Sequence, residues 1–208
     1  MALNENIILK HLFLRDFTEK EYDDCVCVMS PERRERISKA KSLKVRRQTV
    51  AGEMLARKTL AEHHDIDAEK IVFKTTSYGK PYAAGCADFS ISHSNGIVVC
   101  ALGKSAPIGV DVEFIRSVQP EILNRVCTKS DMDYVLGKAA NLNAIPDKLE
   151  PAVLERFFKV WTAKEAYFKC IGTGIKDLKS ISLEKIEKNL YFYTLKNYAV
   201  AVFGTDIK

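Results

Sequence analysis

The sequence predicts an α+β protein built from two similar halves, which we expect at residues 1–105 and 106–208, joined near Pro107. The chain has 208 residues, of which 47% are hydrophobic and 28% are charged, so it is typical of a globular protein and long enough to bury a core. Residues 89–103 and 190–204 share one order of strand, turn and apolar strand ending at a glycine, which indicates a duplicated unit. The junction of two such units is the expected place for a ligand.

The first half begins with a strand signal and two helix signals. Residues 7–14 are mostly apolar and too few for a free helix, so we expect a strand there. Ser30 and Pro31 predict a helix start, because serine caps helix N-termini and proline fits the first turn. From Ser42 to about His63, apolar residues recur at helical spacing and predict a long amphipathic helix.

A hairpin is predicted at the end of the first half. Glycine and proline indicate a turn at residues 78–82. Residues 89–94 then alternate apolar and polar side chains, and Asn95-Gly96 separates them from the apolar run 97–102. Asn-Gly between two such runs predicts a type I′ turn, whose central residues need positive φ. His93 is therefore expected near the turn end of this hairpin.

The second half repeats this mixture of strands and helices. We expect a strand at 108–115, helical structure at 121–137 and a loop at 138–150. Pro151 opens a strongly patterned helix that continues through Lys169. Gly172 and Gly174 follow it and predict its end, since glycine is favoured just past a helix C-terminus.

Basic residues are concentrated in one segment. The net charge is +5, and residues 33–47 hold eight Lys or Arg side chains against one acid, Glu35. Such a block favours an anionic partner, either phosphate or an acidic protein surface. A solvated helix face is the alternative interpretation of the same block.

The cysteines, the first residues and the apolar runs indicate the cellular compartment of the protein. The six cysteines form no CxxC pair and no cluster with histidine at zinc spacing. The first residues lack the basic stretch and apolar run of a signal peptide. No apolar run approaches the ~20 residues that a membrane-spanning helix needs. We therefore expect a protein of the reducing cytoplasm with no membrane partner.

Asp111 and Glu113 are two residues apart in an otherwise apolar strand. Because alternate side chains of a strand share a face, Val110, Val112 and Phe114 are expected to enter the core while both carboxylates project from the other face. Two carboxylates about 4 Å apart repel by about 4 kcal/mol at an effective dielectric of 20, so the pair calls for a cation, a shared proton or a splayed geometry. A strand with one wet face is the simpler alternative.

A third acid adjoins an aromatic stripe on the helix after Pro151. Trp161, Glu165 and Lys169 stand at i, i+4 and i+8, beside the apolar row of that helix. A surface ion pair between Glu165 and Lys169 is one interpretation. The other interpretation is that Glu165 meets the two strand carboxylates in the folded protein. The three acids would then supply oxygen ligands for magnesium, with Lys169 free to contact phosphate. Zinc is disfavoured because no His/Cys ligand set exists.

Four segments of the chain carry a family resemblance. They are Gly79-Lys80-Pro81, residues 89–94, residues 109–113 and residues 161–169. In order and spacing they resemble the signature segments of Sfp-type 4′-phosphopantetheinyl transferases, and the last matches W-x-x-K-E-A-x-x-K without a mismatch. Residues 30–36 are similar to the family's basic N-terminal helix, so the resemblance extends from about Ser30 to the final hairpin.

The resemblance implies a pseudo-twofold monomer of two α+β halves with coenzyme A at their junction. It implies transfer of the 4′-phosphopantetheine arm from coenzyme A to a serine of an apo acyl, peptidyl or polyketide carrier protein, with release of 3′,5′-ADP. It implies that Asp111, Glu113 and Glu165 are magnesium ligands, that Glu165 or water near it is the base for the serine, and that Lys169 contacts the attacked phosphate. It further implies that the adenosine end and its 3′-phosphate are bound by Lys80, Ser92 and His93 with Arg33 and Arg36, and that Thr49 lies near the nucleotide.

One segment departs from the family pattern. Residues 126–131 stand where the family often has Phe-Ser followed by Glu, and Asp131 is the candidate substitute for that glutamate. We expect this loop to help select the carrier protein. Two other functions remain open on the residues alone: a magnesium-dependent phosphatase or nuclease using the same carboxylates, and a nucleic-acid-binding module using the basic block. The resemblance favours the transferase, with no nucleic-acid partner.

Overall fold

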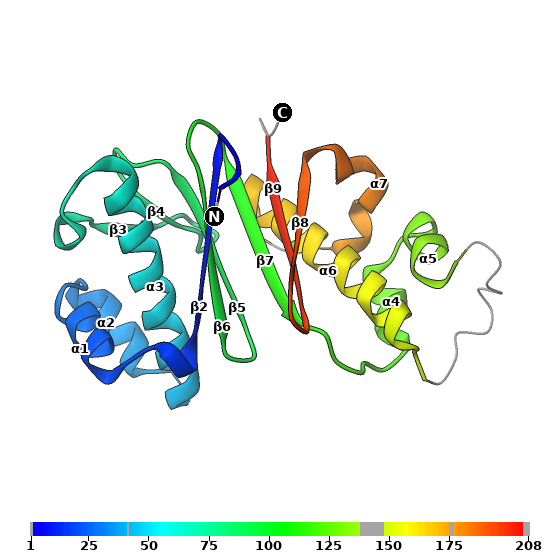
Figure 1. Cartoon of the computed structure of the whole chain (residues 1–208), viewed down its shortest axis with the longest axis horizontal. Helices are drawn as coiled ribbons and strands as arrows, with labels where there is room; N and C mark the ends of the chain where they lie inside the picture. Colours follow the sequence, from blue (N-terminus) through cyan, green and yellow to red (C-terminus); the bar gives the residue numbers. More distant parts are fainter. Residues whose placement is uncertain (1, 41, 138–147, 175–176, 206–208) are drawn as a thin grey trace.

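The N-terminal sheet of this computed structural model has the strand order β1-β2-β6-β5, and every neighbouring pair is antiparallel (Figure 1). The structure describes residues 2–40, 42–137, 148–174 and 177–205. The strands of this sheet are β1 (Ala2–Asn4), β2 (Ile7–Phe13), β5 (Asp88–Ser94) and β6 (Ile97–Gly103). The expected hairpin is confirmed, because Asn95 and Gly96 connect β5 to β6 with φ of 39° and 93°.

One helix, α3 (Leu43–His64), covers the N-terminal sheet, and two further helices pack on α3. These are α1 (Glu19–Cys27) and α2 (Pro31–Ser38), and a small hairpin is formed by β3 (Phe73–Thr75) with β4 (Pro81–Ala83). Both predicted helix starts are confirmed, since the side chains of Ser30 and Ser42 accept hydrogen bonds from backbone N–H groups three residues on. The helix α1 was not expected from the sequence, although Thr18 and Glu21 form a capping box at its start.

The C-terminal sheet has the order β7-β9-β8 and is also antiparallel. Its strands are β7 (Ile108–Phe114), β8 (Leu190–Leu195) and β9 (Tyr198–Gly204). Its helices are α4 (Glu121–Val126), α5 (Lys129–Leu136), α6 (Pro151–Ile171) and α7 (Leu183–Ile186). Short 3-10 turns lie at Leu14–Asp16, Ala68–Lys70, Leu178–Ser180 and Glu187–Asn189.

The predicted segments of this half are largely found, with one difference. The region expected to be helical at 121–137 is two helices, because Cys127 is extended and Thr128 caps a new one. The end of α6 is confirmed at Gly172, which adopts the left-handed conformation. Most of the expected loop, residues 138–147, lies outside the described residues.

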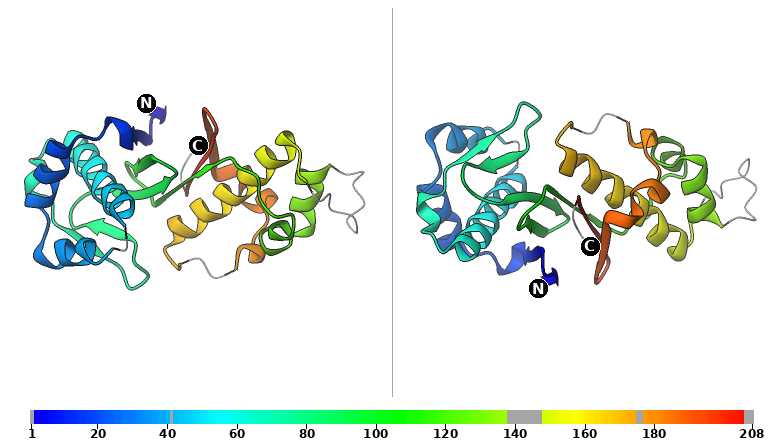
Figure 2. Two further views of the ribbon diagram at one scale, coloured as in Figure 1. Left: turned by 90° about the horizontal axis from the view of Figure 1, so that it is seen from below. Right: turned by 90° about the horizontal axis from the view of Figure 1, so that it is seen from above.

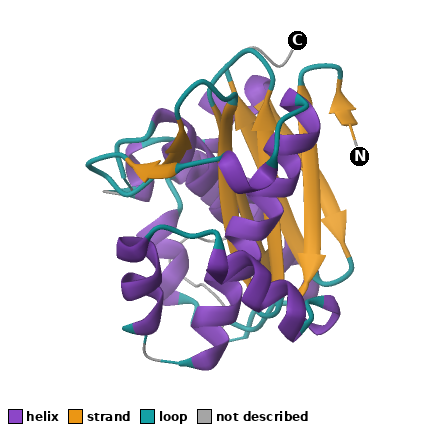
Figure 3. Cartoon of the chain, turned by 90° about the vertical axis from the view of Figure 1, so that its left-hand side faces the viewer, coloured by secondary structure: helices purple, strands orange, loops and turns teal. Residues whose placement is uncertain are grey.

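The core is layered. One apolar cluster lies between α3 and the N-terminal sheet, a second lies between the two sheets, and a third lies between the C-terminal sheet and α6 with α4, α5 and α7. Figures 2 and 3 show the helices on the outer sides and the strands between them. Successive residues of β6 alternate between the first and second clusters, as the period of a strand requires. The α+β class is confirmed, and the sheets leave β5 and β7 as neighbouring edges.

Candidate active site at the junction of the two sheets

Side chains of β5 make the hydrogen bonds that connect this strand to β7 across the two sheets, which share no backbone ladder among the described residues. Asp88, Ser90, Ser92 and Ser94 are every second residue of β5, so they face the same way, whereas His93 is on the other face. Three backbone N–H groups of β7 donate to them: Ile108 to Asp88 (2.8 Å), Val110 to Ser90 (3.1 Å) and Phe114 to Ser94 (3.1 Å). We call this row of contacts the seam.

Asp111 lies in the seam and is 4% exposed. Its Oδ1 accepts hydrogen bonds from Ser92 Oγ at 2.7 Å and from Lys169 Nζ at 2.6 Å. Its Oδ2 is buried and accepts no hydrogen bond from any described residue. Because a buried carboxylate oxygen is costly to leave unpaired, this atom indicates a place for a cation or a donor from a ligand.

The predicted orientation of β7 is confirmed. Val110 and Val112 are buried between the two sheets, and Phe114 packs beside them. The opposite face is not wet at Asp111, because α6 covers it, so the simpler alternative of a solvated strand face is wrong there. Glu113 is half-buried, and its Oε2 accepts hydrogen bonds from Ser94 at 2.9 Å and Arg116 at 3.1 Å.

Glu165 brings a third carboxylate to this face from α6. The pKa of Glu165 is raised to about 7, first by burial and then by the negative charge of Asp111 with a smaller effect of Glu113, while Lys169 opposes the rise. The three predicted metal ligands therefore interact electrostatically, although no three His, Cys, Asp or Glu of the described ranges already form a metal-binding group. The residues fit a divalent cation, since its charge would relieve the repulsion and occupy the unpaired Asp111 oxygen.

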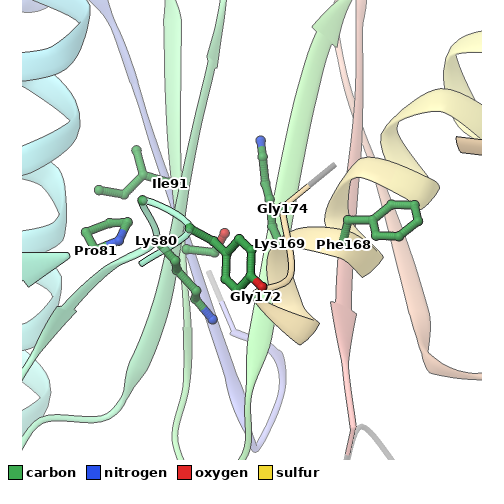
Figure 4. Close-up of a pocket in the computed structure, with 10 residues that line it drawn as sticks. Lys80, Pro81, Ile91, Phe168, Lys169, Gly172 and Gly174 are labelled. Carbon is green, nitrogen blue, oxygen red and sulfur yellow. The ribbon is translucent and has the colours of Figure 1, made fainter. Parts of the chain in front are cut away.

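Lys169 is the cation that pairs with Asp111. Its Nζ donates to Asp111 and, at 2.9 Å, to Ser92. It also lines a pocket of about 270 Å³ between the two halves (Figure 4). Lys80, Pro81 and Ile91 line that pocket from the N-terminal half, while Phe168, Lys169, Gly172 and Gly174 line it from α6 and the turn after it.

A close backbone approach holds α6 on β7. A Cβ atom at Gly109 would lie 1.9 Å from the carbonyl oxygen of Ala166 and 2.5 Å from the N atom of Cys170. Only glycine fits at this distance. Gly109 therefore lets the helix that carries Glu165 and Lys169 approach the strand that carries Asp111.

The remaining predicted residues fall into two groups. Ser92 lies in the seam and Lys80 lines the pocket. His93 is exposed on the other face of β5 and does not line the pocket, and desolvation, followed by the charge of Lys169, lowers its pKa. The others do not line the pocket: Arg33 pairs with Glu53 at 2.9 Å, Arg36 is exposed on α2, and Thr49 bonds to the Val45 carbonyl of its own helix.

Three polar residues of the seam were not anticipated as site residues. Asp88, Ser90 and Ser94 hold β7 in place next to the acids. The signal that would have found them is the polar alternation from 88 to 94, read together with the edge position of its strand.

Comparison with known proteins agrees with this two-half fold. A family model described as 4′-phosphopantetheinyl transferase superfamily matches residues 107–202, and one described as 4′-phosphopantetheinyl transferase, N-terminal, matches residues 16–105. The chain is 31% identical over 163 residues to the 4′-phosphopantetheinyl transferase Sfp of Bacillus subtilis, covering 77% of this chain and 68% of that protein. It is 31% identical over 147 residues to the transferase gsp of Aneurinibacillus migulanus, covering 71% and 57%.

The family models that match the two halves identify a class of transferases. The chain belongs to the 4′-phosphopantetheinyl transferase superfamily. A further relative is the transferase HetI of Nostoc, at 27% identity over 175 residues. The expected enzyme class and two-half fold are thereby confirmed. No described helix has the length and apolar character to span a membrane.

Proposed function

We propose that the protein transfers the 4′-phosphopantetheine group from coenzyme A to a serine of an apo carrier protein, with magnesium, and releases 3′,5′-ADP. The observation that carries the proposal is the buried Asp111 oxygen without a partner, next to two further carboxylates and a lysine. Carboxylate oxygens can bind a hard cation such as magnesium, and that cation together with the lysine can hold a diphosphate. The names of the Bacillus and Aneurinibacillus relatives support the same activity.

The acids of the junction would hold the metal. Asp111, Glu113 and Glu165 supply oxygen ligands from β7 and α6, and Asp111 presents its unpaired oxygen. Magnesium, when bound, supplies charge neutralisation for the diphosphate of coenzyme A. Ser92 and Ser94 orient the two strand carboxylates by donating to them, so the ligand set is partly organised before any metal binds.

Glu165 and Lys169 are proposed to act on the reacting groups. With its pKa at about 7, Glu165 is suited to accept the proton of the serine hydroxyl, directly or through a water. Lys169 stands at the mouth of the pocket and would stabilise charge on the attacked phosphate. Its present bond to Asp111 keeps the ammonium group at the junction until substrate arrives.

The nucleotide end is proposed to occupy the pocket between the halves. Lys80 lines it, Ser92 accepts a hydrogen bond from Lys169, which also lines it, and a neutral His93 ring can donate to phosphate from one nitrogen. Arg33, Arg36 and Thr49 are proposed contacts for the 3′-phosphate side on family resemblance. Arg33 would serve only through donors that its pair with Glu53 leaves over.

The carrier protein is proposed to be an acidic acyl, peptidyl or polyketide carrier. The net charge of +5 favours encounter with an acidic domain and makes that encounter depend on salt. We propose that the enzyme acts as a monomer in the cytoplasm, where its six free thiols stay reduced. The boundary between the halves near residue 105 is likewise part of the proposal.

Intact-mass measurement of carrier proteins tests the proposed function. A panel of apo carriers is incubated with the enzyme, coenzyme A and magnesium, and each is compared with its serine-to-alanine variant. We expect one phosphopantetheine adduct that needs the serine, the metal and Asp111. Release of phosphate or nucleotide without any carrier would instead indicate a phosphatase or nuclease, and no adduct on any carrier contradicts the proposal.

A further inference from the structure

The first residue of β7 is held by an ion pair from the other half of the protein. Lys80 Nζ and Asp88 Oδ2 are 2.6 Å apart, and both side chains are largely buried. Asp88 Oδ2 also accepts the N–H of Ile108 at 2.8 Å, while Lys80 Nζ donates to the carbonyl oxygen of Ile108 at 3.1 Å. The backbone N–H and the carbonyl oxygen of Ile108 are thus both hydrogen-bonded to charged side chains.

This arrangement takes the place of a second hydrogen-bonded neighbour for β7, which pairs with one strand among the described residues. On its other edge, β7 pairs with β9, and Ile108 lies opposite Gly204. On the β5 edge, the ion pair supplies the acceptor and the donor that a neighbouring strand residue would supply. We call Lys80 with Asp88 the clamp. Hydrogen bonds to charged groups contribute more than neutral ones, so the clamp is a strong attachment for its size.

The clamp lies directly before the residues that define the site. Gly109, in contact with α6, is the next residue along β7, and Asp111 follows two residues later. The register of β7 against β5 decides whether Asp111 meets Ser92. A shift at Ile108 would therefore move the Asp111 carboxylate relative to Ser92 and Lys169.

We propose that Asp88 is a positioning residue, which acts with Lys80 to hold the start of β7 and so places Asp111 for transfer. The proposal rests on the proposed function above. It assigns the ammonium group of Lys80 mainly to the protein itself, since Asp88 and Ile108 take up two of its three N–H donors in the structure. Lys80 also lines the pocket (Figure 4).

Two substrates separate positioning from phosphate binding. Coenzyme A and dephospho-coenzyme A differ only in the 3′-phosphate, so a residue that contacts that group discriminates between them. We expect D88N and K80M to lower kcat for transfer on the order of 10- to 100-fold with either substrate, because a small misplacement of reacting groups has effects of this size. The KM for coenzyme A should change much less, and K80R should keep more activity than K80M.

Matched controls and a double variant sharpen this test. K74M removes an exposed lysine from the adjacent strand β3, and D23N removes an exposed acid from α1; both should stay within about twofold of wild type. The D88N/K80M double variant should be no worse than the worse single variant, because the two side chains act as one unit. Independent, multiplying losses would contradict a clamp.

A measurement without catalysis keeps the two proposals apart. Amide hydrogen exchange at Ile108, measured on the whole chain, should accelerate in D88N and K80M and stay unchanged in K74M and D23N. Normal turnover of D88N with unchanged Ile108 exchange overturns the clamp while leaving the transferase function intact. A loss in K80M confined to coenzyme A, with dephospho-coenzyme A unaffected, would make Lys80 a phosphate ligand. If the wild type transfers nothing, the proposed function fails, and Ile108 exchange alone decides on the clamp.

Discussion

Lys164 and Asp131 form an ion pair that solvent does not reach: their charged atoms are 2.6 Å apart and the side chains are 0% and 1% exposed. Lys164 also donates to the carbonyl oxygen of Val126, and Asp131 accepts the N–H of Leu183. The pair thus connects α6 to the segments at α4, α5 and α7. Asp131 belongs to the segment that departs from the family pattern. Its structural role is to neutralise Lys164, which is the residue before Glu165 on α6.

Removal of one partner should destabilise the fold strongly. D131A leaves the Lys164 charge buried without its anion, and breaking such a pair costs about 3 to 5 kcal/mol of the free energy of unfolding. Urea unfolding followed by circular dichroism measures this loss. D133A, in the same helix, serves as the control, and the D131L/K164M pair should recover much of the stability. A loss below about 1 kcal/mol in D131A would contradict a buried pair.

Glu165 should make the metal-free protein less stable as pH rises. Its pKa is about 7 in the folded protein against 4.5 for the free side chain. Between these values the native state holds a proton that the unfolded state has released, so stability is present at low pH and is lost as pH rises through 7. The full effect is up to about 3 kcal/mol.

Denaturant unfolding from pH 5 to 8, with chelator present, checks this pH dependence. The E165Q variant should lack it and should exceed the wild type in stability above pH 7. The comparison isolates Glu165, because the lowered pKa of His93 acts in the opposite direction in both proteins. Identical pH profiles for wild type and E165Q would show that Glu165 is ordinary and solvated.

Lys169 should oppose metal binding and yet promote transfer. Its ammonium group now neutralises Asp111 at 2.6 Å, so K169M should bind magnesium several-fold more tightly, because one competing positive charge is gone. The same variant should lose kcat by 10²-fold or more, on the order expected for a lost electrostatic contact to the reacting phosphate. Calorimetric titration with magnesium and single-turnover transfer give the two readouts. Weaker metal binding in K169M would place the lysine outside the acid cluster.

Gly109 should tolerate no side chain. In G109A the new Cβ meets the backbone of α6 at 1.9 Å, so helix and strand must separate and the acids must part. We expect a loss of stability above about 3 kcal/mol with loss of transfer. G52A is the control, because its Cβ meets only side chains, the nearest being Ile91 at 3.0 Å, and alanine favours the helix. Equal effects in the two variants would argue against a special role for position 109.

Local signals in the sequence predicted local structure. Asn95-Gly96 predicted the hairpin turn, Ser30 predicted a helix cap, and the alternation at Asp111 and Glu113 predicted one shared face. Each prediction depends on neighbours within a few residues, where backbone geometry leaves few choices.

Contacts between distant segments could not be predicted in this way. The pairing of Asp131 with Lys164, and that of Asp88 with Ile108, depends on how two edges or helices meet in space. The burial of Asp111 under α6 has the same origin. The roles of Arg33, Arg36 and Thr49 stay predictions, because their described contacts are within the N-terminal half.

The seam has an implication for how such an enzyme can change. A backbone ladder between two sheets is the same for every sequence, whereas hydroxyl and carboxyl contacts belong to individual residues, each contributing roughly 1 kcal/mol. Point mutations in β5 can therefore loosen or tighten the joint in small steps without dismantling either sheet. The strength of the attachment between the two sheets is therefore adjustable at one strand edge, which makes residues 88 to 94 the natural target for engineering variants of this enzyme.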